Sequence, residues 1–270
     1  MTKYYFLIIT FFTTSLVFAD SGVLLKKLIN TNECIECDLS NLDLKKTNFW
    51  NANIMQSDFS KTNLTRSNLH GANLSKAIFN QAVLIGVQLQ SANLNNANFE
   101  KARATASDLT GASLLEAKLN KADFRGSNMQ AVEFTNGEAI NANMKSINFT
   151  GANLSNSNLS NSDFTGANFT GANLQGANFT GANLNNVDFT GSNLSNVNFT
   201  DASISNTKFI SSNLSNIDFN NVNISQASFK DIFFCGKRLL GKISAGSILD
   251  GIITEDKEDN SSILMSLNCK

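Results

Sequence analysis

The sequence has a single histidine and a single tryptophan among its 270 residues. With His70 alone, no histidine pair can bind a metal, and a histidine-based catalytic triad could rest only on this residue. No close pair of carboxylates stands out in a setting that would raise the pKa of one of them. These absences predict a protein that is not an enzyme, with no catalytic residue, no metal site and no cofactor.

Charge of neither sign dominates. Between residues 38 and 234 there are 14 acidic and 13 basic residues, and the two signs are mixed along the chain. A basic stripe would attract nucleic acid, and a strongly acidic surface would imitate it. The balance of charge therefore predicts that nucleic acid is not a partner.

Long apolar runs are also absent, and the best candidate lies at the N-terminus. Residues 6–17 are mostly apolar and follow Lys3, but a run of about 12 residues is too short to span a bilayer comfortably. Val17 and Ala19 are the small residues that a signal peptidase reads. We therefore expect a signal peptide over residues 1–19, cleavage near Ala19, and export to the bacterial periplasm or cell exterior without stable membrane insertion. An uncleaved N-terminal anchor is the alternative.

What the chain has in abundance is a five-residue repeat. From Leu39 to Phe234 every fifth residue is large and apolar except Ala104 and Ala139; the 40 central positions hold 17 Leu, 16 Phe, three Ile, two Met and these two Ala. A small or β-branched residue lies two positions before each centre, with Leu42 the only clearly bulky exception, and Asn or Asp lies between them in 28 of the 40 units. A period of five fits neither a helix nor a flat strand, so each unit should be a short extended piece followed by a turn. Such a chain has to coil.

The repeated unit, A-N-L/F-x-x, resembles the pentapeptide repeat family. The resemblance implies an all-β solenoid over residues 34–234, a right-handed quadrilateral β-helix with four units per coil. The central residue and the small residue before it would point inward. Coils of about 20 residues at the usual ladder spacing would build a rod on the order of 48 Å long. At Ala104 and Ala139 we expect a local rearrangement or a small void.

Solenoids need caps, because an uncovered terminal coil exposes its apolar core and its unpaired backbone. Apolar residues at helical spacing predict a short helical cap within residues 20–33. Residues 235–270 leave the five-residue phase, and their isoleucines and glycines predict a small C-terminal cap with a short β meander.

The four cysteines are Cys34, Cys37, Cys235 and Cys269. An even number in an exported chain favours disulfides, and the rod would hold the two ends too far apart for a bridge. This predicts pairing of Cys34 with Cys37 and of Cys235 with Cys269, the first pair less firmly because its ring is short. The C-x-x-C at Cys34 leaves a redox centre or half of a metal site as alternatives.

Two sets of side chains are candidates for surface binding. Stacking by 20 residues would put Trp50 and His70 one above the other on an outer face, and would put Thr150, Thr170 and Thr190 in a vertical file. The alternative for both sets is a solvated surface ladder with no ligand.

Together these patterns favour a non-enzymatic structural or protein-interaction scaffold that is exported. A second hypothesis is recognition of an extended surface such as glycan, cell wall or ice by the Asn and Thr files. A third comes from the resemblance, because family members that confer quinolone resistance imitate DNA and bind gyrase. Those proteins are cytoplasmic and acidic, and this chain departs from both properties. The sequence specifies neither the identity of a partner nor the oligomeric state.

Overall fold

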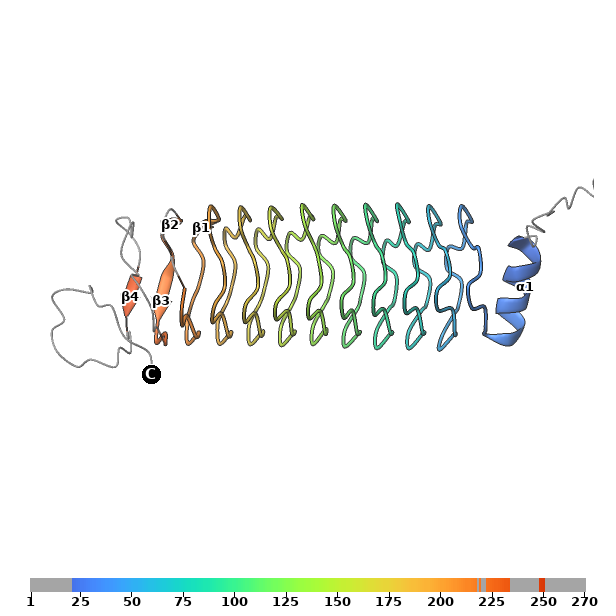
Figure 1. Ribbon diagram of the computed structural model, residues 1–270, viewed down its shortest axis with the longest axis horizontal. Coiled ribbons are helices and arrows are strands. Elements are labelled where there is room, and N and C mark those ends of the chain that lie inside the picture. Colours follow the sequence, from blue (N-terminus) through green and yellow to red (C-terminus); the bar gives the residue numbers. More distant parts are fainter. Residues whose placement is uncertain (1–20, 218, 220–221, 234–247, 251–270) are drawn as a thin grey trace, which may run out of the picture.

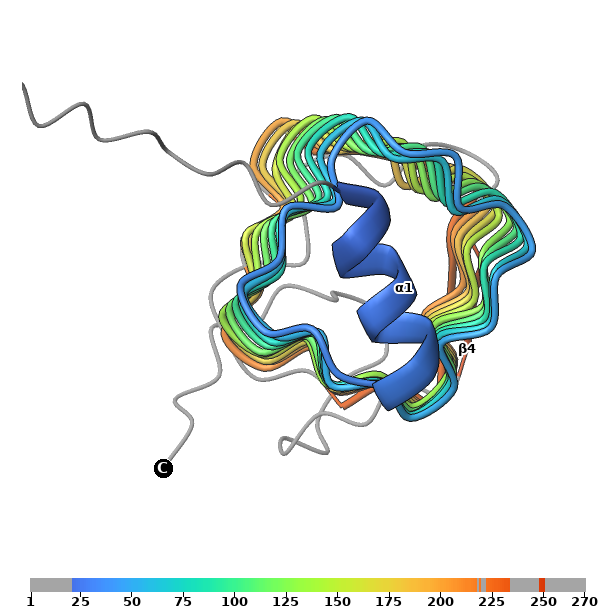
Figure 2. The ribbon, with the colours of Figure 1, turned by 90° about the vertical axis from the view of Figure 1, so that its right-hand side faces the viewer.

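The structure is a computed structural model that describes residues 21–217, 219, 222–233 and 248–250. These residues form a straight rod of stacked coils with the helix α1 at one end (Figure 1). Parallel β-bridges join residues 20 positions apart, from Glu33–Asn53 to Asn213–Phe233, so every coil contains 20 residues. Seen along the axis, the coils superimpose in a four-sided outline (Figure 2). This is the quadrilateral β-helix that the resemblance to the pentapeptide repeat family implies.

Regular strands are short because the chain turns every five residues. β1 (Ser203–Ser205) pairs in parallel with β2 (Asn223–Ser225), and β3 (Ser228–Lys230) pairs in parallel with β4 (Ile248–Asp250). The partners in both pairs are again 20 residues apart. β4 therefore continues the coil register, whereas a β meander would have placed it antiparallel. The remainder of the predicted C-terminal cap, with Cys235 and Cys269, lies outside the described residues.

The turn between units depends on the residue two positions after each centre. Its φ angle lies between 50° and 70° wherever this position is described. The backbone N–H of the next residue donates to the carbonyl of the centre in most units, as Ala52 does to Phe49 at 3.0 Å. This geometry is a type II turn. Glycine, Asn, Lys, Ser and Gln dominate the position, and it holds no β-branched residue in the described units, because such side chains strain a left-handed backbone.

The interior of the rod is filled by the central residues and the small residues before them. Described central side chains are at most 3% exposed. Phenylalanines stack along two opposite sides of the coil, Phe149 to Phe229 on one side and Phe179 to Phe219 on the other, with ring centroids 4.9 to 5.8 Å apart within each file. Rings of the two files meet edge to face at 6.0 to 6.3 Å. The inward residues therefore form one continuous column.

The two alanine centres are accommodated differently. Near Ala139 the residue two positions earlier is Gly137, and a Cβ there would lie less than 3.0 Å from three ring atoms of Phe134. The Phe134 ring thus occupies space that a side chain at position 137 would need, which is a local rearrangement of the kind expected. At Ala104, the carbonyl oxygen accepts hydrogen bonds from the buried hydroxyls of Ser107 and Ser127, at 2.8 and 2.7 Å.

The helix α1 (Ser21–Thr31) lies across the first coil (Figure 2). Leu28 is fully buried in the core, and Leu24 and Leu25 pack against it. The helix ends at Asn32, which takes a left-handed φ of 56°. The N–H of Asn32 donates to Leu28 at 2.8 Å, while its carbonyl accepts from Asn53 in the next coil at 2.9 Å. One residue therefore ends the helix and begins the ladder.

Candidate functional site

The outer faces of the rod are covered by polar side chains that the backbone holds in place. In many units the side-chain oxygen of the Asn or Asp before the centre accepts from the backbone N–H two positions later, as Asn148 accepts from Thr150 at 3.1 Å. Asparagine adds a donor, because its Nδ2 can reach the same position in the previous coil. Asn173 donates to Asn153 and Asn193 donates to Asn173, both at 3.2 Å. The preference for Asn at this position therefore has a structural reason.

One such file of amides has a direction. It runs from Asn213 through Asn193, Asn173 and Asn153, each donating toward the N-terminus, and it ends on Oε2 of Glu133 at 2.9 Å. A carboxylate accepts hydrogen bonds and donates none, so it terminates the file. The arrangement fixes the lateral position of successive coils and makes this face rigid.

The predicted threonine file is present on one face. Thr150, Thr170 and Thr190 lie in three successive coils and are half-buried. Each hydroxyl donates to the side-chain oxygen of the residue two positions earlier, at 2.5 to 2.7 Å. The hydroxyl protons are therefore used within the rod.

Trp50 and His70 lie in adjacent coils at equivalent positions, as the 20-residue stacking predicts. The carbonyl of His70 accepts from the N–H of Asn51 at 2.8 Å. Trp50 is 54% exposed, while His70 is half-buried. The structure brings the two residues together at one edge of the rod and gives no further sign of a ligand there.

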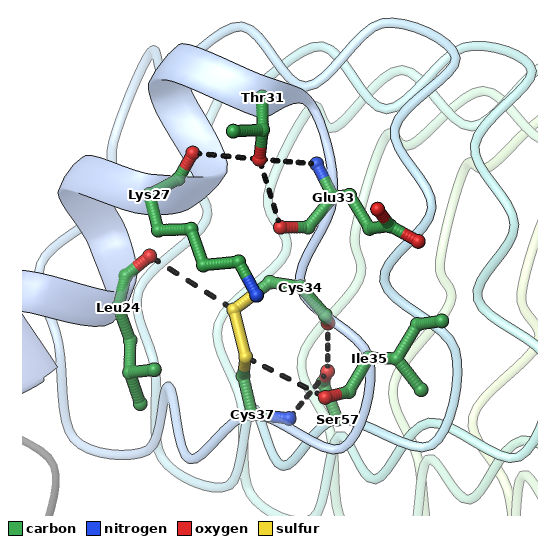
Figure 3. The surroundings of a disulfide bond; sticks show 8 residues. All are labelled: Leu24, Lys27, Thr31, Glu33, Cys34, Ile35, Cys37 and Ser57. Atoms are coloured by element: carbon green, nitrogen blue, oxygen red, sulfur yellow. Dashed lines mark hydrogen bonds between the residues drawn. A yellow bond between two sulfur atoms is a disulfide. The ribbon is translucent and has the colours of Figure 1, made fainter.

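The structure contains a disulfide between Cys34 and Cys37, with Cα atoms 5.6 Å apart. It lies beneath α1, and the carbonyl oxygen of Leu24 is 3.9 Å from Cys34 Sγ (Figure 3). The Ser57 hydroxyl donates to the Cys34 carbonyl at 2.8 Å and accepts from the Cys37 N–H at 3.0 Å. Both cysteines are buried. The disulfide therefore closes a short loop at the start of the first coil, against the helix, and Ser57 of the next coil hydrogen-bonds to the backbone of both cysteines.

Acidic and basic residues alternate along the sequence, but they lie mostly on different faces of the rod. One face is formed by the units centred on Leu44, Leu64, Leu84, Ala104, Phe124 and Met144. This face, together with the left-handed turn residue on either side of it, carries nine exposed cations and two carboxylates, Asp43 and Asp123. We call it the basic face; its cations are Lys45, Lys46, Lys61, Arg66, Lys101, Arg103, Lys121, Arg125 and Lys145. The two signs are mixed along the chain, but in this half of the rod they are not mixed around its circumference.

The acidic residues of the same coils lie mostly on two other faces. Between residues 33 and 146 these faces hold eight carboxylates and two lysines, Lys76 and Lys118. The carboxylates are those of Glu33, Glu36, Asp38, Asp58, Glu100, Glu116, Glu133 and Glu138. The separation is not visible in the order of the sequence, because each five-residue unit lies on the next face of the rod. Comparing residues at 20-residue intervals would have revealed it from sequence.

Some cations of the basic face are paired. Lys45 bonds Asp43 at 2.9 Å, Arg125 bonds Asp123 at 2.7 Å, and Lys145 bonds Asp163 at 3.1 Å. The hydrogen bond from Arg125 lowers the pKa of Asp123 below its ordinary value. At the edge of the face, Lys101 contacts Glu100 at 3.4 Å. Within the described part of the chain, the other five cations form no ion pair: Lys46, Lys61, Arg66, Arg103 and Lys121.

Across the described residues, no group of three His, Cys, Asp or Glu side chains is placed to hold a metal ion. None of the helical segments in that same part of the chain has the length and apolarity needed to span a membrane.

The family model described as pentapeptide repeats matches this chain over most of its length. The matches cover residues 33–71, 67–103, 97–136, 107–145, 147–186, 162–201 and 202–236. No curated protein matches the sequence.

Among solved structures, the chain is similar to HetL, a pentapeptide repeat protein involved in heterocyst differentiation regulation from the cyanobacterium Nostoc sp. strain PCC 7120. The identity is 23%, the TM-score is 0.63, and the alignment covers 86% of this chain and 93% of HetL. This likeness supports the right-handed quadrilateral β-helix and nothing about function.

A second match is a trypsin-treated variant of QnrB1, a plasmid-mediated fluoroquinolone resistance protein. The identity is 20%, the TM-score is 0.45, and the alignment covers 81% of this chain and 89% of QnrB1. This TM-score is too low to support an argument.

Proposed function

Because this chain belongs to the pentapeptide repeat family, whose members are generally structural and non-enzymatic, we propose that it is a non-enzymatic binding scaffold that is exported to the periplasm or cell exterior. The observation that carries the proposal is the rigidity of the outer faces. Hydrogen bonds hold the Asn, Asp and Thr side chains in files at a fixed spacing, as in the run from Asn213 to Glu133. A preordered surface loses little conformational entropy when it binds a partner.

Export is supported by residues 1–19, whose pattern is typical of a signal peptide. The experiment is intact-mass analysis of the protein isolated from each cell fraction. We expect a form that begins at Asp20 and lacks tyrosine, because Tyr4 and Tyr5 are the only tyrosines in the chain. An intact form starting at Met1 in the cytoplasm would overturn the export proposal.

The scaffold role is tested by a pull-down from the exported fraction with the protein that begins at Asp20. We expect retention of a specific protein or polymer that survives washing at moderate salt. The proposal also assigns α1 the role of an N-terminal cap, because Leu24, Leu25 and Leu28 cover the apolar end of the first coil. Turnover of a substrate by the purified protein would contradict the non-enzymatic assignment.

A second candidate function is recognition of an extended surface such as glycan, cell wall or ice by the Asn and Thr files. Thr150, Thr170 and Thr190 repeat at the coil spacing, and hydrogen bonds hold their side chains in place, which suits a repeating ligand. Inhibition of a DNA-handling enzyme by DNA mimicry is less well supported, because the first half of the rod has a basic face rather than a uniformly acidic surface.

A further inference from the structure

The basic face stacks cations of like charge directly above one another. Lys46 and Arg66 occupy the same position in adjacent coils, and so do Lys101 with Lys121 and Arg125 with Lys145. Adjacent coils are separated by roughly 4.8 Å. Like charges one coil apart repel; of these six cations, Lys46, Arg66 and Lys121 form no ion pair in the described chain, whereas Lys101, Arg125 and Lys145 each contact a carboxylate. An anion that bridges two cations would remove the repulsion.

The cations form two groups with an uncharged coil between them. Four lie in the first two coils and five in the fourth to sixth, whereas the third coil presents Val83, Ile85 and Gly86 on this face. The face therefore offers a strip of positive charge interrupted by a small, half-buried apolar patch. A ligand that follows the strip needs negative charges at short regular intervals and an apolar edge between them.

We propose that the basic face binds a linear acidic polysaccharide, that is, a chain of sugar rings with a carboxylate or sulfate on each ring. The repeated anions lie against the stacked cations, and the apolar edge of a ring packs on Val83 and Ile85. This inference rests on the proposed scaffold function and names the class of polymer that the scaffold holds.

The composition of the face argues against two other polyanions. Single-stranded nucleic acid is bound through aromatic platforms on which bases stack, and the basic face exposes no aromatic side chain in the coils described. Anionic membranes are bound by cations next to exposed large apolar residues. The exposed large apolar residues of the described chain all lie elsewhere: Val23, Ile29, Ile35, Trp50, Ile78, Leu115 and Phe233.

The test compares two triple variants that remove the same number of lysines. The first replaces Lys46→Gln, Lys61→Gln and Lys121→Gln on the basic face. The matched control replaces Lys76→Gln, Lys118→Gln and Lys208→Gln on other faces, so net charge and composition are identical. Binding to immobilised polygalacturonate is measured for each purified protein, with neutral dextran as the reference.

We expect the unaltered protein to bind polygalacturonate but not dextran, with an affinity that falls steeply as salt is raised. The basic-face variant should bind at least about tenfold more weakly at low salt, while the control should stay within about twofold. An equal loss in both variants would overturn the assignment to this face. Absence of polygalacturonate binding would overturn the ligand class and leave the pull-down test of the scaffold role unaffected.

Two parallel measurements separate other partners. If oligothymidylate or phosphatidylglycerol vesicles bind as tightly as polygalacturonate with the same dependence on the face, the polysaccharide assignment is wrong. Sedimentation velocity of the protein alone is run at the same low salt. A self-association that salt reverses and the basic-face variant abolishes would assign the face to the acidic side of a second copy instead.

Discussion

Phe169 and Thr170 are adjacent in sequence, but they lie on opposite sides of the coil wall. The Phe169 ring is fully buried and stacks between Phe149 and Phe189 at 5.1 and 5.2 Å. We expect Phe169→Ala to lower the free energy of unfolding by about 3 to 5 kcal/mol, as a large-to-small change in a packed core. Thr170→Ala removes one surface hydrogen bond and should cost about 1 kcal/mol or less. Urea unfolding of both variants measures the difference, and equal costs would contradict the inward register.

Gly137 shows how closely the column is packed. A Cβ at this position would collide with the Phe134 ring. We expect Gly137→Ala to destabilise the rod by about 1 to 3 kcal/mol through overpacking. Leu is the residue one coil above and below Phe134, so Phe134→Leu in the same chain should recover part of that loss. A double-mutant cycle by urea unfolding measures the coupling, and additive costs would show that the two residues do not compete for space.

At the scale of the structural element, the amide file depends on donors as well as acceptors. Asn173→Asp replaces the Nδ2 that donates to Asn153 by an oxygen, so two acceptors would face each other. We expect a loss of about 1 kcal/mol in unfolding free energy. Glu133→Gln is the control, because a Gln oxygen still accepts from Asn153, and its effect should stay within roughly 0.5 kcal/mol. A larger effect for Glu133→Gln than for Asn173→Asp would contradict the direction of the file.

The N-terminal element is held by the Cys34–Cys37 disulfide beneath α1. Replacing both cysteines by Ser should cost about 2 kcal/mol or less, since the closed loop is short. Hydrogen exchange should accelerate in α1 and the first coil while residues 93–200 stay protected, because each coil contacts only its neighbours. Uniform acceleration along the rod would contradict this local effect. Non-reducing peptide mapping also tests the predicted Cys235–Cys269 bridge, which lies outside the described residues.

For the whole molecule, the dependence of folding stability on pH is predicted by aspartates whose side chains accept hydrogen bonds from the residue two positions later. Burial of Asp188 opposes ionisation, but hydrogen bonds from the Thr190 hydroxyl and N–H, together with Lys208, outweigh it and lower the pKa below the ordinary value of 3.8. A lowered folded-state pKa stabilises the protein above the unfolded value and stops doing so as pH falls through the folded value. Stability should therefore decrease below pH 3.8.

Asp188→Asn provides the control for this prediction. Asn168 accepts the same two hydrogen bonds from Thr170 in the previous coil, so the variant should keep the turn near neutral pH. Its unfolding midpoint in urea should change less between about pH 5 and about pH 2 than that of the unaltered protein. An identical pH dependence would show that Asp188 makes no contribution to the acid sensitivity.

The sequence by itself determined the period of five, because the centres from Leu39 onward repeat without a break, and its resemblance to the pentapeptide repeat family implied the inward residues and the coil of 20 residues. It also indicated the helix before the first coil, since Leu24, Leu25 and Leu28 follow helical spacing. Local patterns are sufficient here because each coil contacts only its neighbours. The parallel pairing of β4 was missed, because Ser244 interrupts the run of large apolar centres before Leu249, which keeps the five-residue phase.

The separation of charge between the faces was recognised only in the tertiary structure. Lys101 and Lys121 are 20 residues apart in the chain, with acids such as Glu116 between them, yet they occupy the same position in adjacent coils. The left-handed residue in each turn was likewise not recognised, because Gly, Asn, Lys and Ser have no common chemical property except tolerance of positive φ. Closure of the coil creates both features, since it brings together residues that the order of the chain separates.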